Sequence, residues 1–249
     1  MLKGLSHKIV GAEIPAEQIL WLETAASTNS EMRRRMPEPG HLSIIAARAQ
    51  TAGRGQGTHV WYASPGKNLT FSILYRFEGP CSLAAADTLL ITQVTTLALR
   101  DYLLGHGVQA RIKWPNDIWV GDRKICGILI ENILSGASVQ ASIVGIGLNL
   151  NESGWPPELP NPVSLHELTG RTYDLPEELL RLQKEIRRRF GQLASPDGRV
   201  SLQEEFGKYM FRLPEAPRSP PQDLPPRRRN CPPRQVPRPL RGQPGPCSG

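Results

Sequence analysis

Large apolar side chains alternate with smaller or polar ones in several segments, which is the pattern of strands packed in a sheet. In the segment 69–77, every second residue from Phe71 to Tyr75 is large and apolar, so one face of this strand is expected to meet a core. Shorter apolar runs bounded by glycine or proline are read in the same way. The expected strands are 42–47, 69–77, 108–112 and 138–146, with a hairpin of 118–120 and 125–131.

Segments with helical periodicity lie between these strands. Ser27 or Thr28 can cap a first short helix that runs to about Met36 and ends before Pro37. Longer helices are expected at 82–104 and 176–191, followed by a weakly periodic one at 200–211. Together these elements predict an α+β fold in which a mixed, mostly antiparallel sheet is packed with helices.

The composition of the chain changes near Leu213. Residues 214–249 hold 12 of the 24 prolines and no aromatic residue, so they cannot bury enough surface to offset the entropy lost on ordering. We therefore predict a catalytic-type domain at 1–195, a residual helical segment at 196–213 and a disordered tail at 214–249. A tail rich in proline and arginine could also serve as a polyproline ligand or a nucleic-acid arm.

The net charge of +7 is concentrated in that tail, where seven arginines stand against two acidic residues, so the charge does not by itself indicate a nucleic-acid partner. No apolar run approaches the roughly 18–20 residues that span a bilayer, and the N-terminus lacks the apolar core of a secretion signal. We expect no membrane partner and a cytoplasmic location. The cysteines and histidines show no metal-ligand spacing, so no metal site made by the protein alone is expected.

A glycine-rich loop carries the first candidate chemistry. Its residues are Gln50-Thr-Ala-Gly53-Arg54-Gly55-Gln56-Gly57, with Trp61 shortly after. Glycines let backbone N–H groups approach a ligand, and a guanidinium among them offers a fork of donors to a carboxylate or phosphate. The loop matches neither a P-loop nor a dinucleotide fingerprint. On its own it is also compatible with a flexible turn.

A second motif, Lys113-Trp-Pro-Asn-Asp117, stands where a strand ends. The rigid Trp-Pro pair can hold the lysine towards a pocket. Asn116 and Asp117 are suited to satisfying backbone donors in a turn, and the functional alternative is that Asp117 helps to hold a magnesium–nucleotide complex.

Two further motifs, 122–131 and 145–151, contain glycines inside strand-like runs. Glycine at such positions predicts close approach by a ligand or another backbone. The glycines concerned are Gly127, Gly145 and Gly147.

Taken in this order, the motifs resemble those of biotin–protein ligases over about residues 27–151. That family has a Gln before G-R-G-[RQ], a downstream Trp, K-W-P-N-D, D-x-K-x-x-G-I-L-x-E and G-x-G-x-N, and this chain carries all of them in sequence. Ser27-Thr28-Asn29 also matches the family's S-T-N. The combination of K-W-P-N-D with G-I-L-x-E is highly specific. The resemblance implies the fold of the biotin/lipoate ligase catalytic domain.

The resemblance also implies a two-step ligase. ATP, as its Mg²⁺ complex, would activate biotin to biotinyl-5′-AMP. A lysine of the biotin carboxyl carrier domain of acetyl-CoA carboxylase, or of a related carboxylase, would then accept the biotinyl group. Two anions must meet in the first step, and the family's pattern makes Arg54 and Lys113 the catalytic cations that offset their repulsion.

The remaining site residues are assigned by the same resemblance. The implied biotin-binding residues are Ser27, Thr28, Asn29, Gln50, Gly53, Arg54, Gly55, Gln56, Lys113 and Gly127. The implied nucleotide-binding residues are Arg54, Gln56, Trp61, Asn116, Asp117, Lys124 and Asn149. Trp61 could equally belong to the core, and Trp155 is a further candidate for covering the nucleotide.

Three features depart from the family pattern. The loop has glycine at Gly57 where the family usually has it one position later, and Gln56 stands where many members have arginine. Only 26 residues precede Ser27, so we expect neither the helix-turn-helix of the repressor members nor a DNA partner. The tail at 214–249 stands in place of the family's small C-terminal β domain, as a reading-frame shift would produce, and a natural disordered extension is the alternative.

Three alternatives follow from these departures and from the fold. Loss of the C-terminal domain could leave a biotin-binding remnant that is impaired in catalysis. A lipoate–protein ligase shares the fold and the adenylation chemistry, but this chain lacks that family's R-R-x-x-G-G-G loop and the H-D that follows it. A nucleic-acid-binding role for the tail predicts salt-sensitive binding that is lost when 214–249 are deleted.

Overall fold

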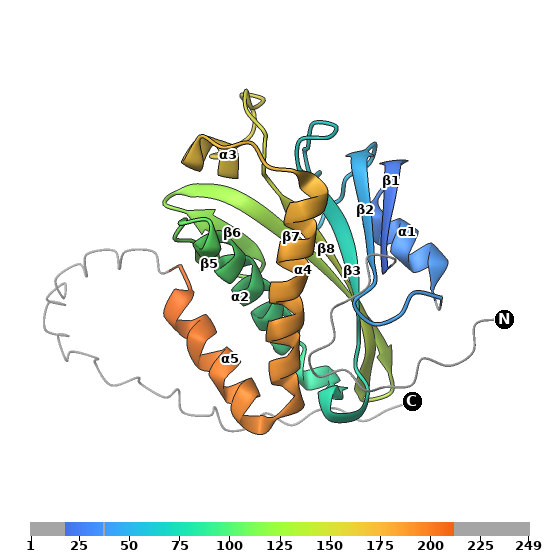
Figure 1. The fold of residues 1–249 in the computed structure, drawn as a ribbon. Helices are drawn as coiled ribbons and strands as arrows, with labels where there is room; N and C mark the ends of the chain where they lie inside the picture. The colour runs from blue at the N-terminus through green and yellow to red at the C-terminus, as the bar shows by residue number, and fades with distance from the viewer. Residues whose placement is uncertain (1–17, 37, 212–249) are drawn as a thin grey trace, which may run out of the picture. The chain divides into compact units, whose positions relative to one another are not determined.

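A computed structural model of the chain describes residues 18–36 and 38–211 (Figure 1). The predicted tail at 214–249 lies outside the described residues. The strands are β1 Ile19–Ala25, β2 Ile44–Gln50, β3 Leu69–Arg76, β4 Leu83–Ala84, β5 Arg111–Lys113, β6 Asp117–Val120, β7 Arg123–Ser135 and β8 Ser138–Leu148. The α-helices are α1 Thr28–Arg35, α2 Leu89–Gly105, α3 Leu165–Thr169, α4 Leu175–Gly191 and α5 Pro196–Tyr209, and the 3-10 turns are η2 Gly79–Cys81, η3 Ala85–Asp87 and η4 Gln192–Ala194.

The strands form one mixed sheet in the order β1-β2-β3-β8-β7-β6-β5. The short strand β4 pairs with the first residues of β8. β1 and β2 run parallel, and the other described pairs are antiparallel. β7 and β8 are the long central strands, and their register places Gly127 opposite Gly147. The predicted mixed, mostly antiparallel sheet is therefore confirmed.

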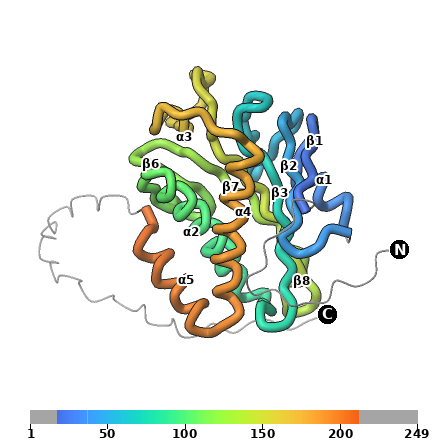
Figure 2. Tube along the Cα trace, viewed as in Figure 1, coloured from blue at the N-terminus to red at the C-terminus, as the bar shows by residue number. Residues whose placement is uncertain are grey.

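The two faces of the sheet are covered by different helices (Figures 1 and 2). α2 and α4 pack against each other over one face, where Phe71, Ile73 and Tyr75 belong to the main core. α1 contacts β2, β3 and β8, and its Met32 packs with Leu74 in a second, smaller cluster. The predicted core-facing side of β3 is confirmed, and its other face meets the second cluster, because successive side chains of a strand point to opposite faces.

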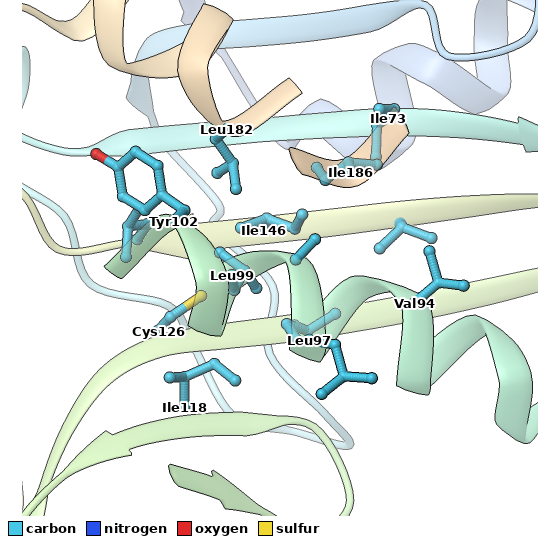
Figure 3. Packing of buried hydrophobic residues seen from close by; sticks show 14 of the residues in the cluster. Ile73, Val94, Leu97, Leu99, Tyr102, Ile118, Cys126, Ile146, Leu182 and Ile186 are labelled. Atoms are coloured by element: carbon cyan, nitrogen blue, oxygen red, sulfur yellow. The ribbon is translucent and has the colours of Figure 1, made fainter. Parts of the chain in front are cut away.

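The main core is built from α2 and α4 against the sheet. Figure 3 shows Leu97 and Leu99 of α2 among Ile146 of β8 and Leu182 of α4. All four side chains are buried. Truncation of a leucine at such a position to alanine costs about 2–5 kcal/mol of the free energy of unfolding, so this packing sets the frame on which the candidate site depends.

α5 belongs to the same compact unit as the rest of the described chain. Its Leu202 and Phe206 are buried in the main core, and the Phe211 N–H donates to the Ile112 carbonyl at 2.6 Å. The described part of the segment predicted as a residual helix at 196–213 therefore contacts β5, whose last residue is Lys113.

Several expected boundaries differ in the structure; the helix predicted at 200–211, for example, is α5 Pro196–Tyr209. The helix predicted to begin at Ser82 begins at Leu89, because Leu83 pairs with Val139 as part of β4. The strand predicted at 108–112 is instead Arg111–Lys113. β1 was not predicted, since its half-exposed residues show no clear alternation of apolar and polar side chains. Within the described residues, no helix is long and apolar enough to cross a membrane.

Candidate active site

A cavity of about 460 Å³ opens where the start of α1, the loop after β2 and the strands β6, β7 and β8 meet. All of the predicted biotin-binding and nucleotide-binding residues line it except Gly53 and Asn149, and the further candidate Trp155 does not line it either. Those that do are Ser27, Thr28, Asn29, Gln50, Arg54, Gly55, Gln56, Trp61, Lys113, Asn116, Asp117, Lys124 and Gly127. Residues from 27 to 127 thus converge on one place, which the sequence motifs alone could not establish.

One end of the cavity is formed by the buried Ser27, Thr28 and Asn29 at the start of α1. The Thr28 N–H donates to Gln50 Oε1 at 2.8 Å. The Ser72 hydroxyl of β3 lies 2.8 Å from Thr28 Oγ1 and 2.5 Å from Asn29 Oδ1. These contacts hold the first helical turn in one orientation, so a set of polar groups is fixed at a buried position.

Ser27 is the N-cap residue of α1, yet its side chain makes no capping hydrogen bond. An N-cap serine usually accepts from a backbone N–H two or three residues further on. Here the hydroxyl is left for the cavity that it lines. A group at the start of a helix is also well placed to meet electron-rich ligand atoms, because the first N–H groups carry a partial positive charge.

Trp61 lies across glycines of β7 and β8. A Cβ built on Gly147 would overlap the Trp61 indole, and one on Gly127 would lie 2.8 Å from the same ring. A Cβ on Gly145 would overlap the Asn29 amide. The prediction that a ligand or another backbone requires these glycines is corrected here: side chains of the site itself occupy the space. The Trp61 indole therefore forms part of the cavity wall.

The loop after β2 folds back on itself as a narrow turn. The Gly55 N–H donates to the His59 carbonyl at 2.8 Å, and the Trp61 N–H donates to the Gly53 carbonyl at 3.1 Å. Gly53 is buried, and a Cβ there would overlap the Trp61 carbonyl. Its place in the loop is therefore structural, whereas Arg54 is about half exposed at the cavity rim.

Lys113 lies at the end of β5, on the same cavity as Arg54. Its ammonium rests over the face of Trp119, 3.8 Å from the ring centre, and makes no ion pair with the residues that the structure describes. Trp119 also lines the cavity, and its Nε1 is buried without a hydrogen-bond partner. Sequence reasoning missed Trp119, although its place two residues after Asp117 was a usable signal.

Two further residues of the 113–117 motif, Asn116 and Asp117, contact residues of β7. Asp117 Oδ1 pairs with Lys124 Nζ at 2.8 Å, and the Asn116 amide donates to the Ile128 carbonyl. Within the described residues no group of three His, Cys, Asp or Glu side chains could hold a metal ion. A divalent cation at this cavity would therefore rely mainly on phosphate oxygens, with Asp117 as the nearest carboxylate of the motif.

Two predicted nucleotide contacts lie elsewhere. Asn149 is buried outside the cavity lining, and its amide donates to the Val163 carbonyl at 3.0 Å. Trp155 does not line the cavity either; its Nε1 donates to Glu167 Oε2 at 3.0 Å. These contacts tie the chain after β8 to α3 and to the residue Val163 shortly before it.

No cysteine is among the described residues that line the cavity. The nearest thiol, Cys126, is fully buried in the main core beside Gly127, and this burial raises the pKa of the thiol. The cavity instead offers two cations, Arg54 and Lys113, together with the buried polar groups of Ser27, Thr28 and Asn29. Such a site suits a small ligand that carries both polar groups and an anion.

Comparison with known proteins identifies a family and several relatives that are similar to this chain. The model of the Biotin/lipoate A/B protein ligase family matches residues 21–149. A biotin–[acetyl-CoA-carboxylase] ligase of Paracoccus denitrificans is 41% identical over 165 residues, which are 63% of this chain and 65% of that protein. The bifunctional ligase/repressor BirA of Bacillus subtilis is 29% identical over 69% of this chain and 51% of its own length.

A solved structure is also similar. The biotin protein ligase from Aquifex aeolicus in complex with biotin and ATP superposes with a TM-score of 0.65 and 26% identity, covering 78% of each chain. The matches to the two curated relatives span between half and two thirds of the length of those proteins.

Proposed function

Because the chain belongs to the biotin/lipoate A/B protein ligase family, we propose that it activates biotin with ATP and transfers the biotinyl group to a protein lysine. The acceptor would be the biotin carboxyl carrier domain of acetyl-CoA carboxylase or of a related carboxylase. The names of the Paracoccus relative and of the Aquifex complex support this choice of acceptor and substrates. We also propose that the reaction takes place in the cytoplasm, where ATP is available.

One observation carries the proposal: Arg54 and Lys113 line the same cavity as the buried Ser27-Thr28-Asn29 end. A carboxylate and a triphosphate repel each other, and their encounter needs fixed positive charge in a place shielded from water. Arg54 comes from a loop and Lys113 from a strand end, yet both reach one volume. That volume, about 460 Å³, falls within the usual range for small-molecule sites.

The chemistry balances without a side-chain nucleophile. A carboxylate oxygen of biotin attacks the α-phosphorus of ATP, the bond to the β,γ-pyrophosphate breaks, and biotinyl-5′-AMP forms. The lysine amine of the carrier then attacks the acyl carbon, loses a proton and displaces AMP. The protein contributes positioning and charge, which together supply most of the acceleration in such reactions.

The residues would divide this work by their position in the cavity. Ser27 and Gln50 would meet the polar ureido end of biotin. Lys113 would contact the carboxylate and the α-phosphate, and Arg54 the phosphates at the rim. Mg²⁺ bound with ATP would neutralise part of the triphosphate charge, with Asp117 as its protein ligand.

Pyrophosphate release tests the proposal. Purified full-length chain with biotin, ATP and Mg²⁺ should release pyrophosphate and form an AMP adduct, and lipoate in place of biotin should not. Addition of a carrier domain should then give biotinylated lysine, detectable by mass spectrometry. Biotin binding without pyrophosphate release would identify a non-catalytic remnant, and turnover with lipoate would identify the alternative substrate; either result overturns the proposal.

A further inference from the structure

Glu131 links two separate parts of the cavity wall. It lies within β7, and its side chain is 19% exposed. Oε2 accepts a hydrogen bond from Asn29 Nδ2 at 2.8 Å, and Oε1 accepts one from Arg54 Nη2 at 3.0 Å. One carboxylate thus holds the first turn of α1 with one oxygen and the glycine-rich loop with the other.

The pairing with Arg54 is the one side-chain hydrogen bond that joins residues 53–60 to the sheet in the part of the chain that the structure describes. The remaining hydrogen bonds of this loop are internal, such as Gly55 N–H to the His59 carbonyl. A turn with two glycines at its tip has high conformational freedom. Its position over the cavity therefore depends in part on Glu131.

The charges around Glu131 favour the same role. Arg33 Nη2 of α1 lies 3.8 Å from Oε1, the oxygen that also accepts from Arg54. Both guanidinium groups thus lie on the same oxygen, and without the carboxylate their like charges would repel each other uncompensated. Glu131 stabilises the inward position of Arg54 by offsetting that repulsion.

Arg54 keeps capacity for a ligand while it is held. Among the described residues it hydrogen-bonds to Glu131 through Nη2, and its other guanidinium nitrogens make no hydrogen bond. A guanidinium carries five N–H donors in a rigid fork. One edge can therefore rest on the carboxylate while another meets a phosphate oxygen.

We propose that Glu131 is a positioning residue of the ligase reaction. It holds Arg54 and the 53–60 loop over the cavity, so that the acyl-adenylate stays bound and shielded from water until the acceptor lysine arrives. The effect on the acyl-adenylate rests on the proposed function. The interaction of Glu131 with the loop can be tested without substrate.

The first experiment measures the loop without substrate. Hydrogen exchange of the Gly55 and Trp61 amides should be about fivefold faster in Glu131→Gln than in the parent chain, because a half-exposed charged pair stabilises by a modest amount. Glu31→Gln is the matched control, since Glu31 pairs with Arg34 and Arg35 of α1 and not with the loop. Equal exchange in Glu131→Gln and the control overturns the proposal.

The second experiment follows the intermediate. Glu131→Gln should release biotinyl-AMP into solution about fivefold faster than the parent chain, while the KM for biotin stays nearly constant. Arg54→Met removes the other partner of the Glu131–Arg54 pair. The double variant, with both Glu131→Gln and Arg54→Met, should release the adenylate no faster than Arg54→Met alone. Additive effects would refute the coupling. A parent chain that forms no adenylate refutes the proposed function, and the exchange measurement then decides alone whether Glu131 holds the loop.

Discussion

The ammonium of Lys113 lies 3.8 Å from the centre of the Trp119 ring, on the wall of the cavity. A register shift between Ile118 and Trp119 interrupts the pairing of β6 with β7, and a bulge of this kind re-aims the side chains beside it. The indole face attracts a cation without neutralising it. Lys113 is thereby oriented while its full charge stays available for an anion.

Replacement of Trp119 should therefore slow adenylate formation. Trp119→Leu removes a cation–π contact worth about 0.5–2 kcal/mol, so we expect kcat for pyrophosphate release to fall about three- to thirtyfold. Lys113→Ala removes the charge itself and should cost about a hundredfold or more. Trp21→Leu is the control, because Arg48 rests over that ring at 5.5 Å outside the cavity. An unchanged kcat in Trp119→Leu would show that Lys113 needs no such support.

Added volume beneath Trp61 should close the site. Gly147→Ala places a methyl group where the indole lies, so Trp61 must move into the cavity. We expect the Kd for biotin, measured by calorimetry, to rise by about tenfold or more, and the free energy of unfolding to drop by about 1–3 kcal/mol. Gly207→Ala, in α5 with no atom within 4 Å of the added Cβ, should leave biotin binding unchanged and raise helix stability by up to about 1 kcal/mol. Biotin affinity at the parent level in Gly147→Ala would contradict the placement of Trp61.

The sequence was informative where its pattern is local. Alternation along β3 predicted its two faces, and Pro176 near the first turn of α4 predicted the start of that helix within a residue. The sequence was uninformative where the conformation of a segment depends on a partner that lies far away along the chain. Leu83 forms a strand because Val139 lies beside it, and nothing in the residues 82–88 indicates this pairing.

The site shows the same division. The motifs identified Arg54 and Lys113 as candidate site residues, and both line one cavity. Glu131 was read only as part of a strand motif, because its partner Arg54 lies 77 residues away. Asn149 was expected near the nucleotide from its motif position, but the side chain points to Val163. A motif identifies residues that matter together and leaves open which of them face the ligand.

Stability should depend on pH through Glu152. Burial by itself raises the pKa of this carboxyl, but hydrogen bonds from the Ser64 N–H and the Asn68 amide, with Lys67 nearby, lower it below the ordinary value of 4.5. A group with a lowered folded-state pKa stabilises the fold above its unfolded pKa, and this contribution is lost as the pH falls through the folded pKa. The loss should therefore begin near pH 4.5 and be complete below the lowered pKa.

Urea unfolding at pH 7 and at pH 3 measures this effect. Glu152→Gln should be less stable than the parent chain at pH 7, by about 1–3 kcal/mol, because the neutral amide weakens the charge-assisted hydrogen bonds from Ser64 and Asn68 and removes the ion pair with Lys67. The difference should narrow at low pH, where the parent carboxyl is protonated as well. A gap of constant size between the two proteins from pH 7 to pH 3 would mean that Glu152 does not titrate as proposed.

Ser27 offers the sharpest separation of binding from folding. It occupies the N-cap of α1 without a capping hydrogen bond and lines the cavity. Ser27→Ala should therefore weaken biotin binding, by about three- to tenfold for one lost hydrogen bond, with little change in Tm. Ser195→Ala is the matched control, because Ser195 caps α5 by accepting from the Gly198 N–H at 3.1 Å. That variant should lose about 1 kcal/mol of stability and bind biotin as the parent does. If Ser27→Ala instead lowers Tm and leaves the Kd for biotin unchanged, its hydroxyl serves the helix, and the polar end of the cavity must be assigned to Thr28 and Gln50.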